Sequence, residues 1–208
     1  IDFNHTDVSN YKRTLDIQKA IATVQYQYKN TVFTRESFVS FPDKLMIIRI
    51  SAKGSEKINL SLRANSLLQY KSSAAGSTLT LSGIAPNHAE PNYRGNMPNA
   101  VTYDPVHSMR FVAIIKCQQT DGKTNSTDTS FNISGATEVV LHISTATSFN
   151  GAEKDPGTQG LNEIKLAQAP LDGASTRTFD QIKQRHTSDF ERYFNRVDLS
   201  LGGETTSN

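Results

Sequence analysis

The chain has 208 residues, one cysteine and a formal net charge of +2, with 22 basic and 20 acidic residues interspersed. This balance argues against nucleic acid or an anionic membrane as the main partner, because either requires a concentrated basic face. No apolar run approaches the ~18 residues of a membrane-spanning helix. The opening residues show no leader pattern and no initiator methionine, so we expect Ile1 to mark a processed or engineered boundary. The apolar run around Cys117 predicts a buried, unreactive thiol.

The first 85 residues predict antiparallel β-strands. The segments with strand patterning are 23–29, 30–41, 44–52, 57–64 and 77–85. The first two are joined by the polar pair Lys29-Asn30, which is typical of a tight hairpin. The third has a continuous apolar centre, which indicates a strand buried on both faces. The charges Arg13 and Asp16 on a still earlier strand indicate a solvated face.

The middle of the chain alternates between loops and further strands. Residues 86–105 are rich in Pro, Asn and Gly and have no periodicity, and aperiodic loops of this length are often functional. Strands are predicted again over 109–119, 129–135 and 137–147. Asp121-Gly122 between the first two of these is typical of a hairpin turn. A second irregular stretch, 148–160, ends the β region.

From about Leu161 the apolar period changes from 2 to 3.6, which predicts helix, most clearly over about 178–197. Ser175 or Thr176 is the expected N-cap. The apolar stripe of this helix consists of Phe179, Ile182, Phe190, Tyr193, Phe194 and Val197. His186 fills the same stripe, and we expect it to pack there with one ring nitrogen bonded to a backbone carbonyl. Leu199 and Leu201 then alternate like a short strand.

These elements predict a mainly β fold, an antiparallel β-sandwich over 1–160 followed by one or two helices over 161–208. An apolar stripe that includes several aromatic side chains requires a broad apolar partner surface. The helix can fold back on the sandwich, or it can pack on something beyond residue 208, and the pattern alone does not decide between them.

Tyr93 and Arg94 in the first irregular loop are candidate ligand contacts. An exposed tyrosine stacks on a sugar face, and an arginine forks onto hydroxyls or carboxylates. The alternative is a loop that folds around Tyr93 as an anchor. His107 beside this loop is a third candidate substrate-binding residue.

Other combinations of polar residues carry less information about chemistry. His88, Glu90, Asp104 and His107 form a histidine and acid cluster, but their spacing fits no ligand pattern, so we predict no metal and no cofactor. Four acids, which are Asp43, Asp104, Glu153 and Asp155, could pair for glycoside hydrolysis. Nothing in the sequence brings two of them to a useful distance. No nucleophile, phosphate-loop or dinucleotide motif is present.

Several segments, in order along nearly the whole chain, resemble the N-terminal domain of glycoside hydrolase family 95, the 1,2-α-L-fucosidases. Residues 11–52 are similar to its Tyr-x-Arg-x-Leu-Asp-Leu opening, its Tyr-x-Arg-Glu-x-Phe-x-Ser-x-Pro-Asp run and an apolar strand. Residues 107–117 resemble its Gly-Met-x-Phe strand, with Ser108 in place of the glycine. Residues 144–160 resemble its Thr-Ser-Phe-Asn-Gly and Lys-Asp-Pro segment. Residues 185–202 resemble its linker, with Phe190 and Tyr193 as departures.

The resemblance implies a β-supersandwich, then linker helices, then an (α/α)6 barrel that holds the catalytic residues. It therefore implies that the carbohydrate partner, a fucosylated glycan cleaved with inversion, belongs to a parent enzyme whose barrel would be the intramolecular partner of this chain. No catalytic residue of the family has a counterpart in residues 1–208, so we expect the chain alone to be inactive. A periplasmic or secreted bacterial location is also implied by the resemblance.

Three alternatives remain open from the sequence. The parent could act on α-L-galactosides, as relatives in the family do. The chain could instead be a stand-alone carbohydrate-binding sandwich that uses Tyr93, Arg94 and His107. It could also be a structural or adhesive β domain, which would associate with itself and bind no sugar.

Overall fold

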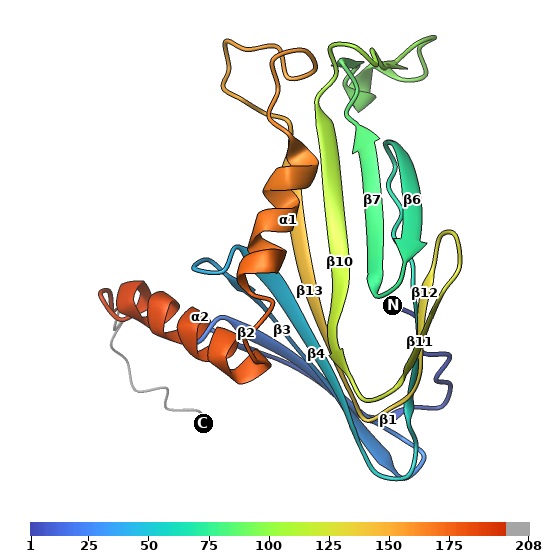
Figure 1. The fold of residues 1–208 in the computed structure, drawn as a ribbon, viewed down its shortest axis with the longest axis vertical. Helices are drawn as coiled ribbons and strands as arrows, with labels where there is room; N and C mark the ends of the chain where they lie inside the picture. The colour runs from blue at the N-terminus through green and yellow to red at the C-terminus, as the bar shows by residue number, and fades with distance from the viewer. Residues whose placement is uncertain (199–208) are drawn as a thin grey trace, which may run out of the picture.

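A computed structural model describes residues 1–198 and shows an antiparallel β domain followed by two helices (Figure 1). The strands are β1 (Ser9–Asp16), β2 (Ile21–Tyr28), β3 (Thr31–Ser40), β4 (Leu45–Lys53), β5 (Ile58–Leu62), β6 (Gln69–Ala75), β7 (Thr78–Ile84), β8 (His88–Ala89), β9 (Val101–Thr102), β10 (Arg110–Thr120), β11 (Lys123–Ser126), β12 (Phe131–Ala136) and β13 (Glu138–Thr147). The helices are the 3-10 turn η1 (Asn92–Arg94), α1 (Glu163–Gly173) and α2 (Phe179–Phe194). The predicted mainly β class with C-terminal helices is confirmed.

Two sheets carry the fold. The larger has eight strands in the order β1-β2-β3-β4-β13-β10-β7-β6, and the smaller has three in the order β11-β12-β5. A two-stranded β8-β9 ribbon stands apart from both sheets. β2 and β3 form the predicted hairpin, and Lys29 takes a left-handed φ of 51° in its turn. β1 is an edge strand exposed along its whole length, as the charges at Arg13 and Asp16 predicted.

The middle strands of the large sheet are buried on both faces, which explains the apolar centre of β4. Ile48 and Ile50 belong to a core shared with the small sheet, which we call the sandwich-side core. Leu45 and Ile47 point the other way, into a core shared with α1 and α2, which we call the helix-side core. Alternation along one strand thus fills two cores. Cys117 is 8% exposed in the sandwich-side core, and burial raises the pKa of its thiol to about 11.

The turn at Asp121-Gly122 differs from the predicted hairpin. β10 before it pairs with β7 and β13, whereas β11 after it pairs with β12, so the turn carries the chain from one sheet to the other. The Asp121 carboxylate accepts bonds from the Thr137 backbone N–H (2.7 Å) and hydroxyl (2.5 Å). A Cβ on Gly122 would lie 2.7 Å from the Ala136 Cβ. These tertiary contacts replace the local pairing that an Asp-Gly turn usually supports.

Helix α2 begins where the apolar pattern predicted, but its N-cap differs from the expected residue. Thr178, not Ser175 or Thr176, is the N-cap, and it forms a reciprocal capping box with Gln181. That box satisfies two free backbone donors at once and fixes the first turn. His186 on the helix is 4% exposed, and its Nε2 lies 2.9 Å from the Lys19 carbonyl oxygen, which confirms its predicted packing role.

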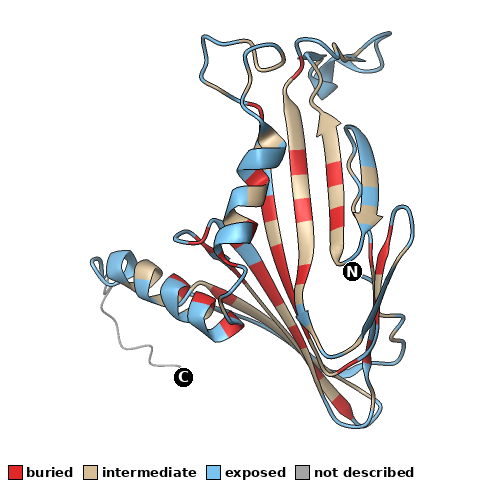
Figure 2. Ribbon diagram, viewed as in Figure 1, coloured by how far each residue is buried: buried red, intermediate tan, exposed pale blue. Residues whose placement is uncertain are grey.

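Burial along α2 is uneven (Figure 2). Phe179, Ile182 and His186 in its first half are buried against the large sheet. Tyr193 is 52% exposed and Phe194 is 38% exposed near its end, and Val197 beyond it is 81% exposed. The helix therefore folds back on the sandwich with one half and presents apolar side chains with the other. The predicted short strand at Leu199 and Leu201 lies outside the described residues. No helix in residues 1–198 is long and apolar enough to cross a membrane.

Candidate functional site

Tyr93 and Arg94 lie in η1, inside the loop that the β8-β9 ribbon closes. Arg94 Nη1 donates to Glu90 Oε2 at 2.7 Å, and His88 Nε2 lies 3.0 Å from Glu90 Oε1. Hydrogen bonds from His88 and then Arg94 hold the pKa of Glu90 below its ordinary value. Arg94 is thus engaged within its own loop. Tyr93 is 84% exposed, so it does not anchor the loop.

His107 lies in a different loop and pairs with Asp155. His107 Nδ1 is 2.8 Å from Asp155 Oδ2, and the hydrogen bond to this carboxylate raises the pKa of the imidazole. The other oxygen, Oδ1, accepts from the backbone N–H groups of Gly157 (2.9 Å) and Thr158 (2.7 Å). The Thr158 bond and the contact with His107 lower the pKa of Asp155 to about 2. At neutral pH the pair therefore carries a stable negative charge on Asp155.

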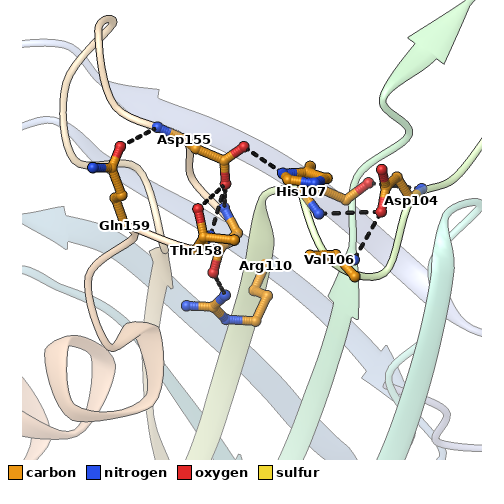
Figure 3. Close-up of polar contacts among 9 residues, drawn as sticks. Asp104, Val106, His107, Arg110, Asp155, Thr158 and Gln159 are labelled. Carbon is orange, nitrogen blue, oxygen red and sulfur yellow. Dashed lines mark hydrogen bonds and ion pairs between the residues drawn. The ribbon is translucent and has the colours of Figure 1, made fainter.

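Arg110 joins the loop that carries Asp155 to the start of α1, and Figure 3 shows its contact with the loop. Its Nη1 donates to the Gly157 carbonyl at 2.6 Å, and its Nε donates to Glu163 Oε2 at 3.1 Å. Gly157 also approaches the His107 loop closely, because a Cβ there would lie 1.9 Å from the Val106 carbonyl oxygen. The two loops and the helix start are therefore held as one rigid assembly, and residue 157 has to be glycine.

The three sequence-derived site residues lie in two different loops. Among the described residues, no hydrogen bond joins the Tyr93–Arg94 loop to the His107–Asp155 pair. The partner of His107 was not predicted, because Asp155 is 48 residues away in the sequence. A local signal existed, since Asp-Pro-Gly-Thr is a typical sequence for an aspartate that caps its own turn.

Three of the four acids that could have served hydrolysis are committed to other contacts. The Asp43 side chain is fully buried among positively charged partners, and Asp155 is bonded to His107 and its own turn. Asp104 Oδ1 accepts from the backbone N–H groups of Val106 (2.9 Å) and His107 (3.2 Å). Across residues 1–198, no group of three or more His, Cys, Asp or Glu side chains is arranged to hold a metal ion.

Two carboxylates, one on β3 and one in the turn between β3 and β4, anchor α2. Asp43 accepts from Ser40 Oγ at 2.6 Å and from Arg185 Nε at 3.0 Å, and Arg177 Nη1 lies 3.4 Å away. Glu36 on β3 accepts from Lys183 Nζ at 2.6 Å and from Arg49. Partial burial opposes ionisation of Glu36, but the bonds from Lys183 and Arg49 outweigh it and lower its pKa. Sequence reasoning did not identify either anchor.

Beyond these anchors, α2 borders an apolar surface, which we call the α2 apolar end. It consists of Val39, Phe41, Phe190, Tyr193, Phe194 and Val197. A cavity of about 300 Å³ lies among four of them together with His186 and Asp189. Phe41 is 77% exposed and Val39 is 65% exposed, so the surface extends from the helix onto the end of β3. Exposed apolar patches of this size are candidate interaction surfaces.

The comparisons with known proteins agree with this architecture. Residues 1–152 match the family model described as "Glycosyl hydrolase family 65, N-terminal domain". Alpha-L-fucosidase 2 of Arabidopsis thaliana is 25% identical over 96% of this chain and 24% of its own length. Probable alpha-fucosidase A of Aspergillus niger is 24% identical over 94% of this chain and 24% of its own length. A solved structure, "Putative kojibiose phosphorylase from human microbiome", has a TM-score of 0.60 at 12% identity over 93% of this chain and 26% of that one.

The fold and these matches place the chain in the class of β-rich N-terminal domains of glycoside hydrolases. Because the family model covers most of the chain, the chain belongs to the family of glycosyl hydrolase family 65 N-terminal domains. The chain spans about a quarter of the length of the related proteins it matches. The expected kinship with glycoside hydrolases is confirmed, while the narrower resemblance to family 95 stays a prediction.

Proposed function

We propose that this chain is the non-catalytic N-terminal part of a family 95-type α-L-fucosidase, which removes terminal α-L-fucosyl residues from glycans by inversion. Residues 1–160 form the sandwich, and residues 161–208 lead to a catalytic (α/α)6 barrel in the same polypeptide. Two matched relatives are named as fucosidases, and this chain covers about a quarter of each. A secreted or periplasmic location accompanies this proposal.

The observation that carries the proposal is the division of α2 into two halves. The first half is fixed to the large sheet by Asp43 and Glu36, so the helix direction is set by the sandwich. The second half holds Tyr193 and Phe194 in the exposed α2 apolar end. A helix that is anchored at one end and has an uncovered apolar face at the other is suited to pack between two domains.

The chemistry belongs to the parent in this proposal. Three of the four candidate acids, Asp43, Asp104 and Asp155, are engaged in capping and anchoring contacts, which supports an inactive domain. Hydrolysis of 2′-fucosyllactose tests this directly. The purified 208-residue chain should release fucose no faster than buffer, and release well above that level would contradict the proposal.

Substitutions in the parent enzyme test whether the second half of α2 contacts the catalytic barrel. Replacing Tyr193 and Phe194 with serine should lower its fucosidase activity and its thermal stability, because the contact with the barrel is lost. Asp180→Ala is the matched control on the same helix, since Asp180 is 85% exposed and lies outside the α2 apolar end. A gene whose reading frame stops soon after codon 208 would refute the proposal, and α-L-galactoside cleavage by the parent would refute only the fucosyl specificity.

A further inference from the structure

A cavity of about 610 Å³ lies at the end of the large sheet where α1 begins. β6, β7 and β10 form its floor, and the first turn of α1 and Pro105 form its walls. Pockets for small ligands usually have volumes of roughly 300–1,000 Å³, so this one is large enough for one or two sugar rings. It is separate from the α2 apolar end and from the Tyr93–Arg94 loop, because it shares no lining residue with either.

The strand register shows which side chains face this cavity. Lys71 pairs with Ser82, and Ser82 pairs with Val112, which belongs to the helix-side core. Directly paired residues share a face of the sheet, so Lys71 and Ser82 face the helix side. The next row on that face is Gln69, Ile84 and Arg110, and the Arg110 bond to Glu163 on α1 confirms the direction.

The cavity combines donors with acceptors. The Glu163 side chain is only 13% exposed, and its Oε2 accepts from Arg110. No hydrogen bond within residues 1–198 uses its Oε1. Lys71 forms no ion pair with any described residue, and Gln69 and Ser82 add an amide and a hydroxyl. Ile84 and Ile164 supply apolar surface beside these groups.

We propose that this cavity is a binding site for a neutral saccharide. Pyranose rings present hydroxyls that both donate and accept, and C–H faces that require apolar contact. Glu163 Oε1 accepts from one hydroxyl, and Lys71 and Gln69 donate to neighbouring ones. Ile84 and Ile164 contact the C–H face. Arg110 is a positioning residue, because its bonds to Gly157 and Glu163 fix the carboxylate.

The affinity expected of this site is low. Tyr70 and Phe111 border the cavity, but alternation places their rings on the opposite face of the sheet, so no aromatic ring stacks on the sugar. Millimolar binding is therefore expected. The site goes beyond the proposed function, which assigns no ligand to this domain. It does not depend on that function either, because binding is measured on the domain alone.

The test is a titration of the 208-residue chain with 2′-fucosyllactose and with D-galactose, followed by amide chemical shifts up to about 30 mM sugar. We expect saturable shifts that cluster on β6, β7 and the first turn of α1. Ser82→Trp fills the floor and should weaken binding at least tenfold. Lys71→Ala, on an exposed edge strand that tolerates substitution, should weaken it several-fold. Tyr93→Ala is the matched control and should leave binding unchanged.

The result that would overturn the proposal is equally specific. It fails if neither sugar gives saturable shifts, if Ser82→Trp and Lys71→Ala bind as the original chain does, or if only Tyr93→Ala loses binding. Tighter binding of glucuronate than of galactose would identify an anion site instead and would also overturn it. None of these results bears on the fucosidase activity of the parent, so failure here and failure of the proposed function are distinguishable.

Discussion

Asp155 shows how one carboxylate can organise two loops. Its Oδ1 caps its own turn, and its Oδ2 contacts His107 in a loop from elsewhere in the chain. The raised pKa of His107 contributes stability that is present below pH 6.5 and is lost as the pH rises through the folded value. The lowered pKa of Asp155 contributes stability that is present above about pH 4 and is lost toward pH 2. The contact between the loops is therefore strongest in mildly acidic solution.

Removing the charge of Asp155 tests this assignment. In Asp155→Asn the pKa of His107 should fall toward its ordinary value, because the amide cannot stabilise the imidazolium. An NMR titration of the His107 ring measures it directly. Glu90→Gln is the control, since Glu90 contacts His88 rather than His107. An unchanged His107 pKa in Asp155→Asn would show that the contact does not persist in solution.

His142 is a buried core residue whose polar ring atoms are unsatisfied. It lies on β13, is 1% exposed, and neither ring nitrogen has a hydrogen-bond partner among the described residues. Burial, with a smaller contribution from Lys116, lowers its pKa to about 4. Between pH 6.5 and 4 the unfolded chain therefore binds a proton that the folded chain does not, so stability falls as the pH falls through that window.

Replacing His142 with leucine should make stability less sensitive to acid. The original chain should lose about 2 kcal/mol of its free energy of unfolding between pH 7 and pH 5 through this residue alone, because one pKa unit corresponds to about 1.4 kcal/mol. His142→Leu should lack that loss in urea unfolding at the two pH values, and His88→Gln, at an exposed position, should retain it. Equal pH dependence in the original chain and His142→Leu would contradict the assignment.

At the scale of elements, α2 is fixed by charge as much as by apolar contact. Arg177 lies just before the helix and Arg185 lies on it, and both reach the fully buried Asp43 side chain at the turn between β3 and β4. The capping box at Thr178 sets the start of the helix between them. The aromatic rings of Phe179 and His186 pack on Phe38 below. Ion pairs, the capping box and aromatic packing thus each fix the position and direction of the helix.

Asp43→Ala should destabilise the chain by about 1–3 kcal/mol, because it leaves the buried Ser40 hydroxyl and the partly exposed Arg177 and Arg185 without their shared acceptor. Hydrogen exchange should increase in α2 before it increases in β10 or β13, since α2 loses its anchor. Gln184→Ala is the control, because Gln184 is exposed on the same helix and should change stability by less than about 0.5 kcal/mol. Unchanged exchange in α2 of the Asp43→Ala chain would show that apolar packing alone holds the helix.

At the scale of the molecule, much of the fold followed from periodicity, and little of the site did. The apolar centre of the segment that became β4 predicted burial on both faces, because a continuous apolar run can be seen within one segment. The direction of the Asp121-Gly122 turn was not predictable, because it depends on contacts with Thr137 and Ala136 across sheets. The pairing of His107 with Asp155, and the convergence of Lys71, Ser82 and Glu163 on one cavity, depend on strand order. Strand order is not written in any single segment.

The place of β13 in the large sheet has a consequence for how the chain is made. β13 is the last strand to be synthesised within residues 1–198, yet it lies between β4 and β10 in the middle of the sheet. Until residues 138–147 leave the ribosome, the strands on either side have no shared partner and exist as two separate half-sheets with open edges. Closure of the sheet is therefore a late, long-range event in biosynthesis, and the nascent chain remains open to mispairing until it occurs.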